Sequence, residues 1–254
     1  MNIKVIAYQL VLEIKRYGRD RMGAFWTFAF PFLMLYLFMW MYGGDKYGLS
    51  NSYLVAGMVG MTIIATCLFG FAVVLVDLRA REVFKMFHLF PLGRVDYLLA
   101  FVLSRVIILT GFSVFYLLVA HAIYGLDLRA DWGQWLAIVS LLLMGSITFL
   151  AFGLALSSRL SSVTAATGLT NLLYFPLIFL SDLFYPQQGL PSWVAQAINL
   201  FPLTDFVNAL RGAIAPTVEW SRIGELMPKL LIWTTVSLLL TVYGFRWHNK
   251  RNND

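Results

Sequence analysis

The hydrophobic pattern of the chain consists of long, nearly uninterrupted apolar runs separated by short polar segments. Six runs reach the roughly 17 to 25 residues that a helix needs to cross a bilayer while satisfying its own backbone hydrogen bonds. We therefore predict six transmembrane helices, with kinks where Pro31 and Pro176 fall inside the first and fifth runs. The runs lie at 24–42, 53–76, 97–124, 132–158, 160–181 and 227–246.

The segment before the first run has a different, amphipathic pattern. Ile6, Leu10, Ile14 and Tyr17 share one face of a helix, whereas the basic residues lie mostly elsewhere. We predict an interfacial helix over 3–21 that lies in the headgroup layer, since it is too charged for the apolar part of a signal peptide. A plain basic N-terminal tail is the alternative.

A charged amphipathic segment joins the second and third runs. Asp77 and Arg81 stand four residues apart and can support the start of a helix over 78–90, which Pro91 and Gly93 would stop. This helix either lies on the membrane surface or docks into a cytoplasmic partner through an apolar ridge and a charged row. The ridge holds Val83, Met86, Phe87 and Phe90, and the charged row holds Arg81, Lys85 and His88.

The connection between the fifth and sixth runs, over residues 185–226, is too apolar for an ordinary solvated loop and is interrupted by prolines. Pro191 and Ser192 can start one short helix, and Thr204 can cap a second one that Gly212 ends. Its apolar residues, such as Phe206, should contact the membrane or the helix bundle. We therefore expect re-entrant helices that dip into the outer leaflet.

The fifth run opens with small and weakly polar residues, "SSVTAATGLTN" at 161–171. Such residues allow helices to approach closely, and they can also line a wetted path. Of these two interpretations, we favour close helix packing.

Composition and charge give the class and the orientation. The chain is 60% hydrophobic and 13% charged, whereas about a quarter of the residues are charged in typical soluble domains. We assign fourteen of the nineteen Lys and Arg residues to the side that holds the N-terminus. Because short basic loops tend to stay in the cytoplasm, we expect both termini and the 78–90 segment there. Cys67 is the single cysteine, so no disulfide can form within the chain.

The sequence lacks several motifs of membrane chemistry. No Gly-x-x-x-x-Gly-Lys-Ser/Thr motif occurs, so ATP energy would come from another chain. No carboxylate falls in the middle of a run, which argues against an ion-coupled carrier, while Arg105 lies about two turns inside the third run and can snorkel or pair. A membrane-embedded lipid enzyme would need a polar triad or metal set, which we do not find. That enzyme and a structural scaffold are the alternatives from other classes.

Three segments carry a family resemblance: "RYGRDRMGAFWTFAFPFLMLYLF", "LRAREVFKMFHLFPLGR" and "FPLIFLSDLFYPQQGLPSWVAQAINLFPLTDFVNALRG". With them the chain resembles, over nearly its whole length, the membrane subunits of bacterial type-2 ABC exporters. The resemblance implies an all-α integral membrane fold: a single permease domain over 1–254 with six crossings, an N-terminal elbow helix, a cytoplasmic coupling helix and re-entrant outer helices. The chain departs from the family where Ser181-Asp182 replaces a common Ser-Gly, and where Val83 follows Arg81-Glu82 in place of Gly.

The resemblance also implies a function and partners. The chain would be the permease of an exporter in the bacterial inner membrane, paired with a second permease copy as a homodimer or a paralogous heterodimer and surrounded by membrane lipid. It would bind no cofactor, metal or nucleic acid and catalyse no reaction, because ATP and Mg²⁺ belong to two copies of a separate ABC ATPase. The cargo would be an amphipathic or hydrophobic drug or lipid, with lipid-linked glycan export as the nearest alternative.

Two groups of residues follow as candidate sites. The residues expected to couple the chain to the ATPase are Arg79, Arg81, Glu82, Val83, Lys85, Met86, Phe87, His88 and Phe90. The residues expected at the outer gate are Pro186, Pro191, Trp193, Pro202, Phe206, Leu210 and Arg211.

Overall fold

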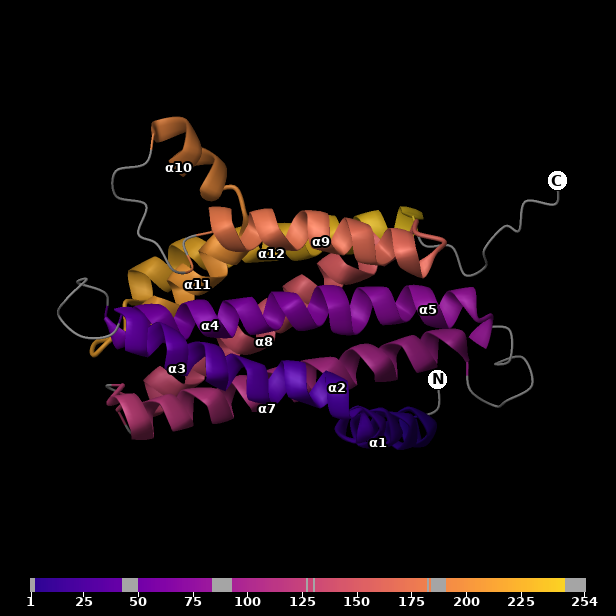
Figure 1. Ribbon diagram of the computed structural model, residues 1–254, viewed down its shortest axis with the longest axis horizontal. Helices are drawn as coiled ribbons and strands as arrows, with labels where there is room; N and C mark the ends of the chain where they lie inside the picture. The colour runs from indigo at the N-terminus through magenta and orange to yellow at the C-terminus, as the bar shows by residue number, and fades with distance from the viewer. Residues whose placement is uncertain are drawn as a thin grey trace.

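The computed structural model describes residues 3–42, 50–83, 93–126, 128–129, 131–181, 183 and 191–244. Over these residues the chain forms helices joined by turns and bends, with no strand. Six of the helical stretches are long and apolar enough to cross a membrane, as predicted. Figure 1 shows the long helices lying side by side along one axis. We name the ends of this bundle the α1 end, on the right of Figure 1, and the α11 end, on the left.

The first crossing follows a separate helix, α1 (Ile3–Arg19), as the amphipathic pattern predicted. α1 packs mainly against α7, and Figure 1 shows it strongly foreshortened while the long helices lie in the plane of the picture. α1 therefore runs across the bundle axis. The crossing itself consists of α2 (Arg21–Ala24), η1 (Phe25–Ala29) and α3 (Phe30–Tyr42).

η1 is a π-helical turn that ends two residues before Pro31. The N–H group of Phe30 donates to the carbonyl of Phe25, five residues back. Proline lacks an N–H, and its ring would clash with the carbonyl four residues earlier, that of Thr27. The widened turn at this position accommodates the proline within one continuous helix.

The second crossing is longer than predicted and contains a second π-helical segment. It consists of α4 (Asn51–Ala65), η2 (Thr66–Val73) and α5 (Val74–Ala80). Ser50 caps its start by accepting a hydrogen bond from the N–H of Tyr53 at 3.2 Å. The helix thus continues four residues beyond the predicted end at Val76.

The third, fourth and fifth crossings agree with prediction to within three residues at each end. Gly125 ends the third with the positive φ angle of 64° that glycine adopts without strain. Asp131 and Ser162 cap the starts of the fourth and fifth with their side chains, and the fifth continues through Pro176. The three helices are α7 (Arg94–Tyr124), α8 (Trp132–Ser157) and α9 (Val163–Leu180).

The last part of the chain forms α10 (Ser192–Ile198), α11 (Pro202–Ala213) and α12 (Trp220–Gly244). The prediction that Thr204 caps the second short helix is wrong, because α11 already begins at Pro202 and the Thr204 hydroxyl donates to the Ile198 carbonyl at 3.0 Å. The predicted start of the sixth crossing at residue 227 is also wrong. α12 begins at Trp220 and continues through Pro228, so the connection before it is shorter than 185–226.

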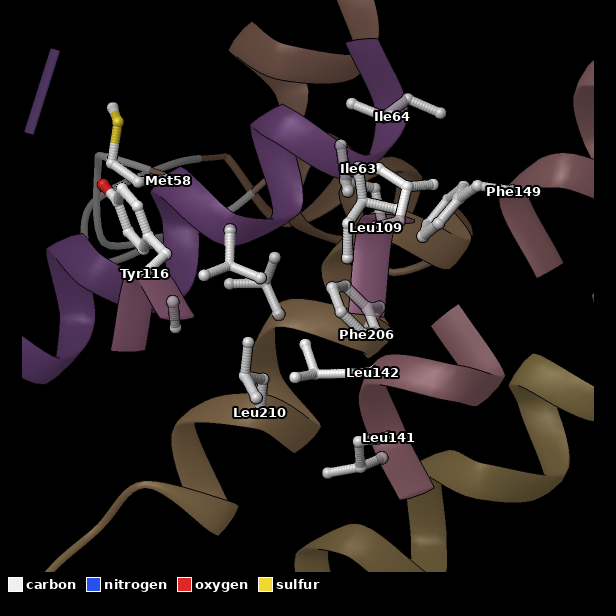
Figure 2. Close-up of a cluster of buried hydrophobic side chains, with 14 of the residues drawn as sticks. Met58, Ile63, Ile64, Leu109, Tyr116, Leu141, Leu142, Phe149, Phe206 and Leu210 are labelled. Carbon is white, nitrogen blue, oxygen red and sulfur yellow. The ribbon is translucent and has the colours of Figure 1, made fainter. Parts of the chain in front are cut away.

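The core of the bundle is formed by the second and fourth crossings, which are the most buried, together with α11. Side chains of α4, α7, α8 and α11 converge in one cluster, among them Ile63, Leu109, Leu142 and Phe206 (Figure 2). The first, fifth and sixth crossings expose most of their residues to the surroundings. A short helix before the last crossing is therefore built into the protein interior.

Candidate functional site

The end of α5 places the first of the predicted coupling residues. α5 continues the second crossing to Ala80, Arg81 ends the helix, and Glu82 adopts a left-handed conformation with φ of 58°. A single coupling helix over 78–90 is therefore wrong for its first residues, because the chain turns sharply at 81–82. Val83 is partly buried. Five predicted coupling residues lie outside the described part of the chain: Lys85, Met86, Phe87, His88 and Phe90.

Arg79 points into the protein. It is only 4% exposed. Its Nη1 donates to the carbonyl of Ser158 at 3.1 Å, and its Nη2 donates to the carbonyls of Leu160, at 2.8 Å, and Ser157. These carbonyls lie at the C-terminus of α8 and in the α8–α9 turn (residues 158–162), where a helix leaves acceptors unpaired and favours positive charge. We call this arrangement the Arg79 clamp.

Arg81 and Asp77 form an ion pair in which Nε donates to Oδ1 at 2.8 Å. The pair stands at the C-terminal end of α5 and not at the start of a new helix, which corrects the predicted position. The Arg81 side chain is 73% exposed. The hydrogen bond to Asp77 raises the pKa of its guanidinium, so Arg81 is a charged group on the surface beside the buried Arg79.

At the opposite end, α11 brings together four of the predicted gate residues. Phe206 and Leu210 are fully buried, and Pro202 starts the helix. The Phe206 ring lies 5.8 Å from that of Phe149 and so close to Gly145 that a Cβ atom there would stand 2.3 Å from it. The apolar side of this segment was expected to contact the membrane or the bundle, and for α11 the structure shows contact with the bundle.

Arg211 connects α11 to α4 and to residue 183. It is 8% exposed, and its guanidinium carbon lies 3.5 Å from the centre of the Tyr53 ring. Nη2 donates to the Leu183 carbonyl at 3.2 Å, and Nη1 donates to Oδ1 of Asn208 at 3.1 Å. The same Asn208 oxygen accepts from Arg222, which also pairs with Glu219 at 3.1 Å.

The remaining gate candidates are not part of this buried group. Trp193 of α10 is 72% exposed, and Pro191 is exposed as well. Figure 1 shows α10 standing away from the bundle at the α11 end. Pro186 lies outside the described residues. The predicted gate thus divides into a buried helix, α11, and an exposed one, α10.

Three buried charged residues were missed or misjudged by sequence reasoning. Arg105 was expected to snorkel or pair, but it is 7% exposed and lies 4.1 Å from the Tyr17 ring centre and 5.0 Å from that of Phe101. Buried Glu13 of α1 accepts a hydrogen bond from the Tyr97 hydroxyl at 3.2 Å. The burial of Glu13 could have been predicted, because this residue lies on the same face of α1 as Ile14 and Tyr17.

Asp205 of α11 is the third of these residues. It is buried, and its Oδ1 lies 3.5 Å from the ammonium group of Lys229. Burial raises the pKa of the Asp205 carboxyl above its ordinary value, and Lys229 opposes that rise. A carboxylate in the first turn of a helix is also favoured by the helix dipole. The pair joins α11 to α12.

Comparison with known protein families decides what kind of protein carries these features. The family model for the ABC-2 type transporter matches residues 7–215, which include most of α1, the first five crossings, α10 and α11. The chain belongs to the ABC-2 type transporter family. Its members are the membrane subunits of ABC transporters, so this ABC-2 permease is a transport subunit and not itself the catalytic one. A comparison with curated proteins finds no match.

Proposed function

We propose that this ABC-2 permease is the membrane subunit of an exporter that moves an amphipathic or hydrophobic substrate, such as a drug or lipid. A separate ABC ATPase, bound in two copies, hydrolyses ATP with Mg²⁺. The substrate path forms between two permease copies, either identical or paralogous. The family membership and the six membrane-spanning helices support this proposal.

The observation that carries the proposal is the shape of the chain at the end of α5. Arg79 fixes the last turn of the second crossing to the α8–α9 turn, while Arg81 and Glu82 are exposed immediately beyond it. The amphipathic residues 83–90 follow at once. A rigid helix end that leads into a charged, amphipathic segment is suited to dock a partner and to transmit its movement to the membrane helices.

The charge distribution supports an orientation with the α1 end in the cytoplasm. Basic residues gather in α1, at the end of α5 and in the α8–α9 turn, which lie at this end of the bundle (Figure 1). In a bacterial inner membrane this asymmetry keeps both termini inside. α1 then lies as an elbow helix in the inner headgroup layer. α10 and α11 become the re-entrant outer segment and form the outer gate.

A second permease copy would face α9. Ala165, Thr167 and Gly168 are exposed on this helix, although it is long and apolar enough to span the membrane. Small and weakly polar residues let two helices approach closely without lipid between them. This face suits a permease partner that completes the substrate path.

The proposal is tested by purifying the tagged chain with the ABC ATPase that is retained on it. The Phe87→Ala, Lys85→Glu double variant removes one ridge contact and reverses one charge of the segment after α5. We expect it to insert normally but to lose ATPase association or substrate-stimulated turnover. Arg129→Glu, an exposed residue between α7 and α8 at the α11 end, is the matched charge reversal and should keep both. Unchanged association and turnover in the double variant would refute docking through this segment.

The orientation has its own test. In a Cys67→Ala background, a membrane-impermeant thiol reagent applied to whole cells should label Trp193→Cys and should not label Ala80→Cys. Both positions are exposed in the structure, so access depends on the side of the membrane alone. Labelling of Ala80→Cys without labelling of Trp193→Cys would reverse the orientation.

A further inference from the structure

We propose that Arg79 is a positioning residue that makes the end of α5 and the α8–α9 turn move as one rigid unit. In this arrangement a displacement imposed at Arg81 and Glu82, directly beyond α5, is delivered to α8, α9 and α12 together. The inference rests on the proposed function, because the ATPase would impose that displacement. Arg79 acts here through the backbone of another part of the chain and not by touching the ATPase.

The geometry of the Arg79 clamp supports a rigid connection. A guanidinium group is planar and its donors are fixed relative to one another, so bonds to several acceptors restrain both distance and orientation. Arg79 binds the carbonyls of Ser157, Ser158 and Leu160. These acceptors belong to backbone that ends one helix and leads into the next. Rotation or sliding of α5 against this turn would break several hydrogen bonds at a buried site.

The α8–α9 turn also supports the last crossing. Gly244, at the end of α12, packs so closely on this turn that an added Cβ would lie 2.9 Å from Oγ of Ser158 and 3.2 Å from Nε of Arg159. α12 and α8 share a long interface, which includes a 2.7 Å hydrogen bond between Thr148 and Thr234. The turn therefore connects the ends of α5, α8, α9 and α12.

The burial of Arg79 separates this role from docking. A side chain that is 4% exposed and bound to internal carbonyls presents no surface to a partner. The exposed neighbour Arg81 is the docking candidate, whereas Arg79 ties the end of α5 to the α8–α9 turn. The two arginines, two positions apart, thus predict two different phenotypes.

The functional test compares Arg79→Met and Arg79→Lys with the wild-type permease. We expect both variants to retain ATPase association while transport per ATP hydrolysed falls by about three- to tenfold, since coupling networks of this kind shift by that amount. A lysine side chain keeps the charge but lacks the planar fork, so Arg79→Lys should not restore coupling. If Arg79→Met fails to insert into the membrane, Arg79→Lys alone provides the test. Unchanged transport per ATP in the inserted variants would overturn the proposal. Lost association would also overturn it, because Arg79 would then be needed for docking itself and not only for coupling.

A distance measurement tests the rigid unit without relying on the ATPase. Spin labels are placed at Ala80→Cys and Arg159→Cys, both exposed, in a Cys67→Ala background. Pulsed electron resonance on the permease alone should give one narrow distance distribution with Arg79 present and a broad one in Arg79→Lys. An equally broad distribution with Arg79 present would overturn the proposal. If this distance behaves as expected but no ATPase is retained on the purified chain, the proposed function fails and the rigid unit stands.

Discussion

The two ends of the bundle each hold a buried arginine that binds backbone carbonyls, but the surroundings of the two side chains differ. Arg79, at the α1 end, donates to three carbonyls of one short piece of backbone. Arg211, at the α11 end, divides its bonds between the Leu183 carbonyl, the Asn208 side chain and the Tyr53 ring. Asn208 is in turn shared with the surface residue Arg222.

This difference fits the rigid α1 end that we propose for the Arg79 clamp, together with a more adjustable α11 end. Bonds to the backbone of a single turn are lost when α5 moves against that turn or when the turn deforms. Bonds to side chains can be exchanged, because Asn208 and Arg222 have other rotamers and other partners. The α11 end nevertheless contains the fully buried Phe206, whereas the α1 end contains the left-handed Glu82. Side-chain packing therefore determines the structure of the α11 end, and local backbone conformation determines that of the α1 end.

The largest expected effect is that of Phe206→Ala. It removes a ring from the core between α11 and α8 and should destabilise the protein by about 3–5 kcal/mol. Thermal unfolding in detergent measures the loss, with Trp193→Ala on exposed α10 as the control, expected to change little. If Trp193→Ala proved the more damaging, the assignment of α11 to the core would be wrong.

Arg211→Met should have the next largest effect, about 2–3 kcal/mol, because the Leu183 carbonyl and Asn208 lose a charged donor at a buried site. Arg222→Met, whose side chain is 42% exposed, should cost roughly 0.5 kcal/mol or less. The unfolding midpoints of the two variants show how much the buried arginine and the surface arginine of this network each contribute to stability. Equal losses would show that the network is not divided into a buried and an exchangeable part.

Gly145→Ala tests the fit of α11 against α8 from the opposite side. The added Cβ would lie 2.3 Å from the Phe206 ring, and the overpacking should cost about 1–3 kcal/mol. Adding Phe206→Leu makes room, so the double variant should be less destabilised than the sum of the two single changes. Strict additivity in unfolding measurements would argue against direct contact.

The smallest expected effect, and one of opposite sign, is that of Glu82→Gly at the α1 end. Glycine adopts φ of 58° without the strain that a side chain brings, which should stabilise the protein by up to about 1 kcal/mol. Arg81→Gly, at a negative φ, is the matched control and should give no such gain. A lower unfolding midpoint for Glu82→Gly would show that contacts of the Glu82 carboxylate outweigh the strain.

The crossings could be predicted because a bilayer requires long apolar helices, and such helices appear in the sequence as long apolar runs. The ends of the helices were predicted less accurately, because some residues are compatible with more than one position in a helix. The sixth crossing was expected to start at residue 227, yet α12 begins at Trp220 and continues through Pro228, although a proline is better tolerated in a first turn. Asp77 and Arg81 fit the start of a helix as well as the end of one.

The buried charges could not be predicted because their stabilisation comes from parts of the chain far apart in sequence. Arg79 looked like one more basic residue of an exposed segment, and only the fold brings it to Ser157 and Leu160. Arg105 depends on Tyr17 of α1 in the same way. The burial of Phe206 and Leu210 was easier to predict, because the apolar face of a helix must be shielded from water by either lipid or protein.

The π-helical segment η2 sets the rotational phase of everything that follows it in the second crossing. A π-turn holds one residue more than an α-turn, and each residue of an α-helix turns the chain by about 100°. If Thr66–Val73 wound as an ordinary α-helix with all its residues, the extra residue would rotate α5 by about that angle. The guanidinium of Arg79 would then face away from the carbonyls of the α8–α9 turn, although no residue in contact with it had changed.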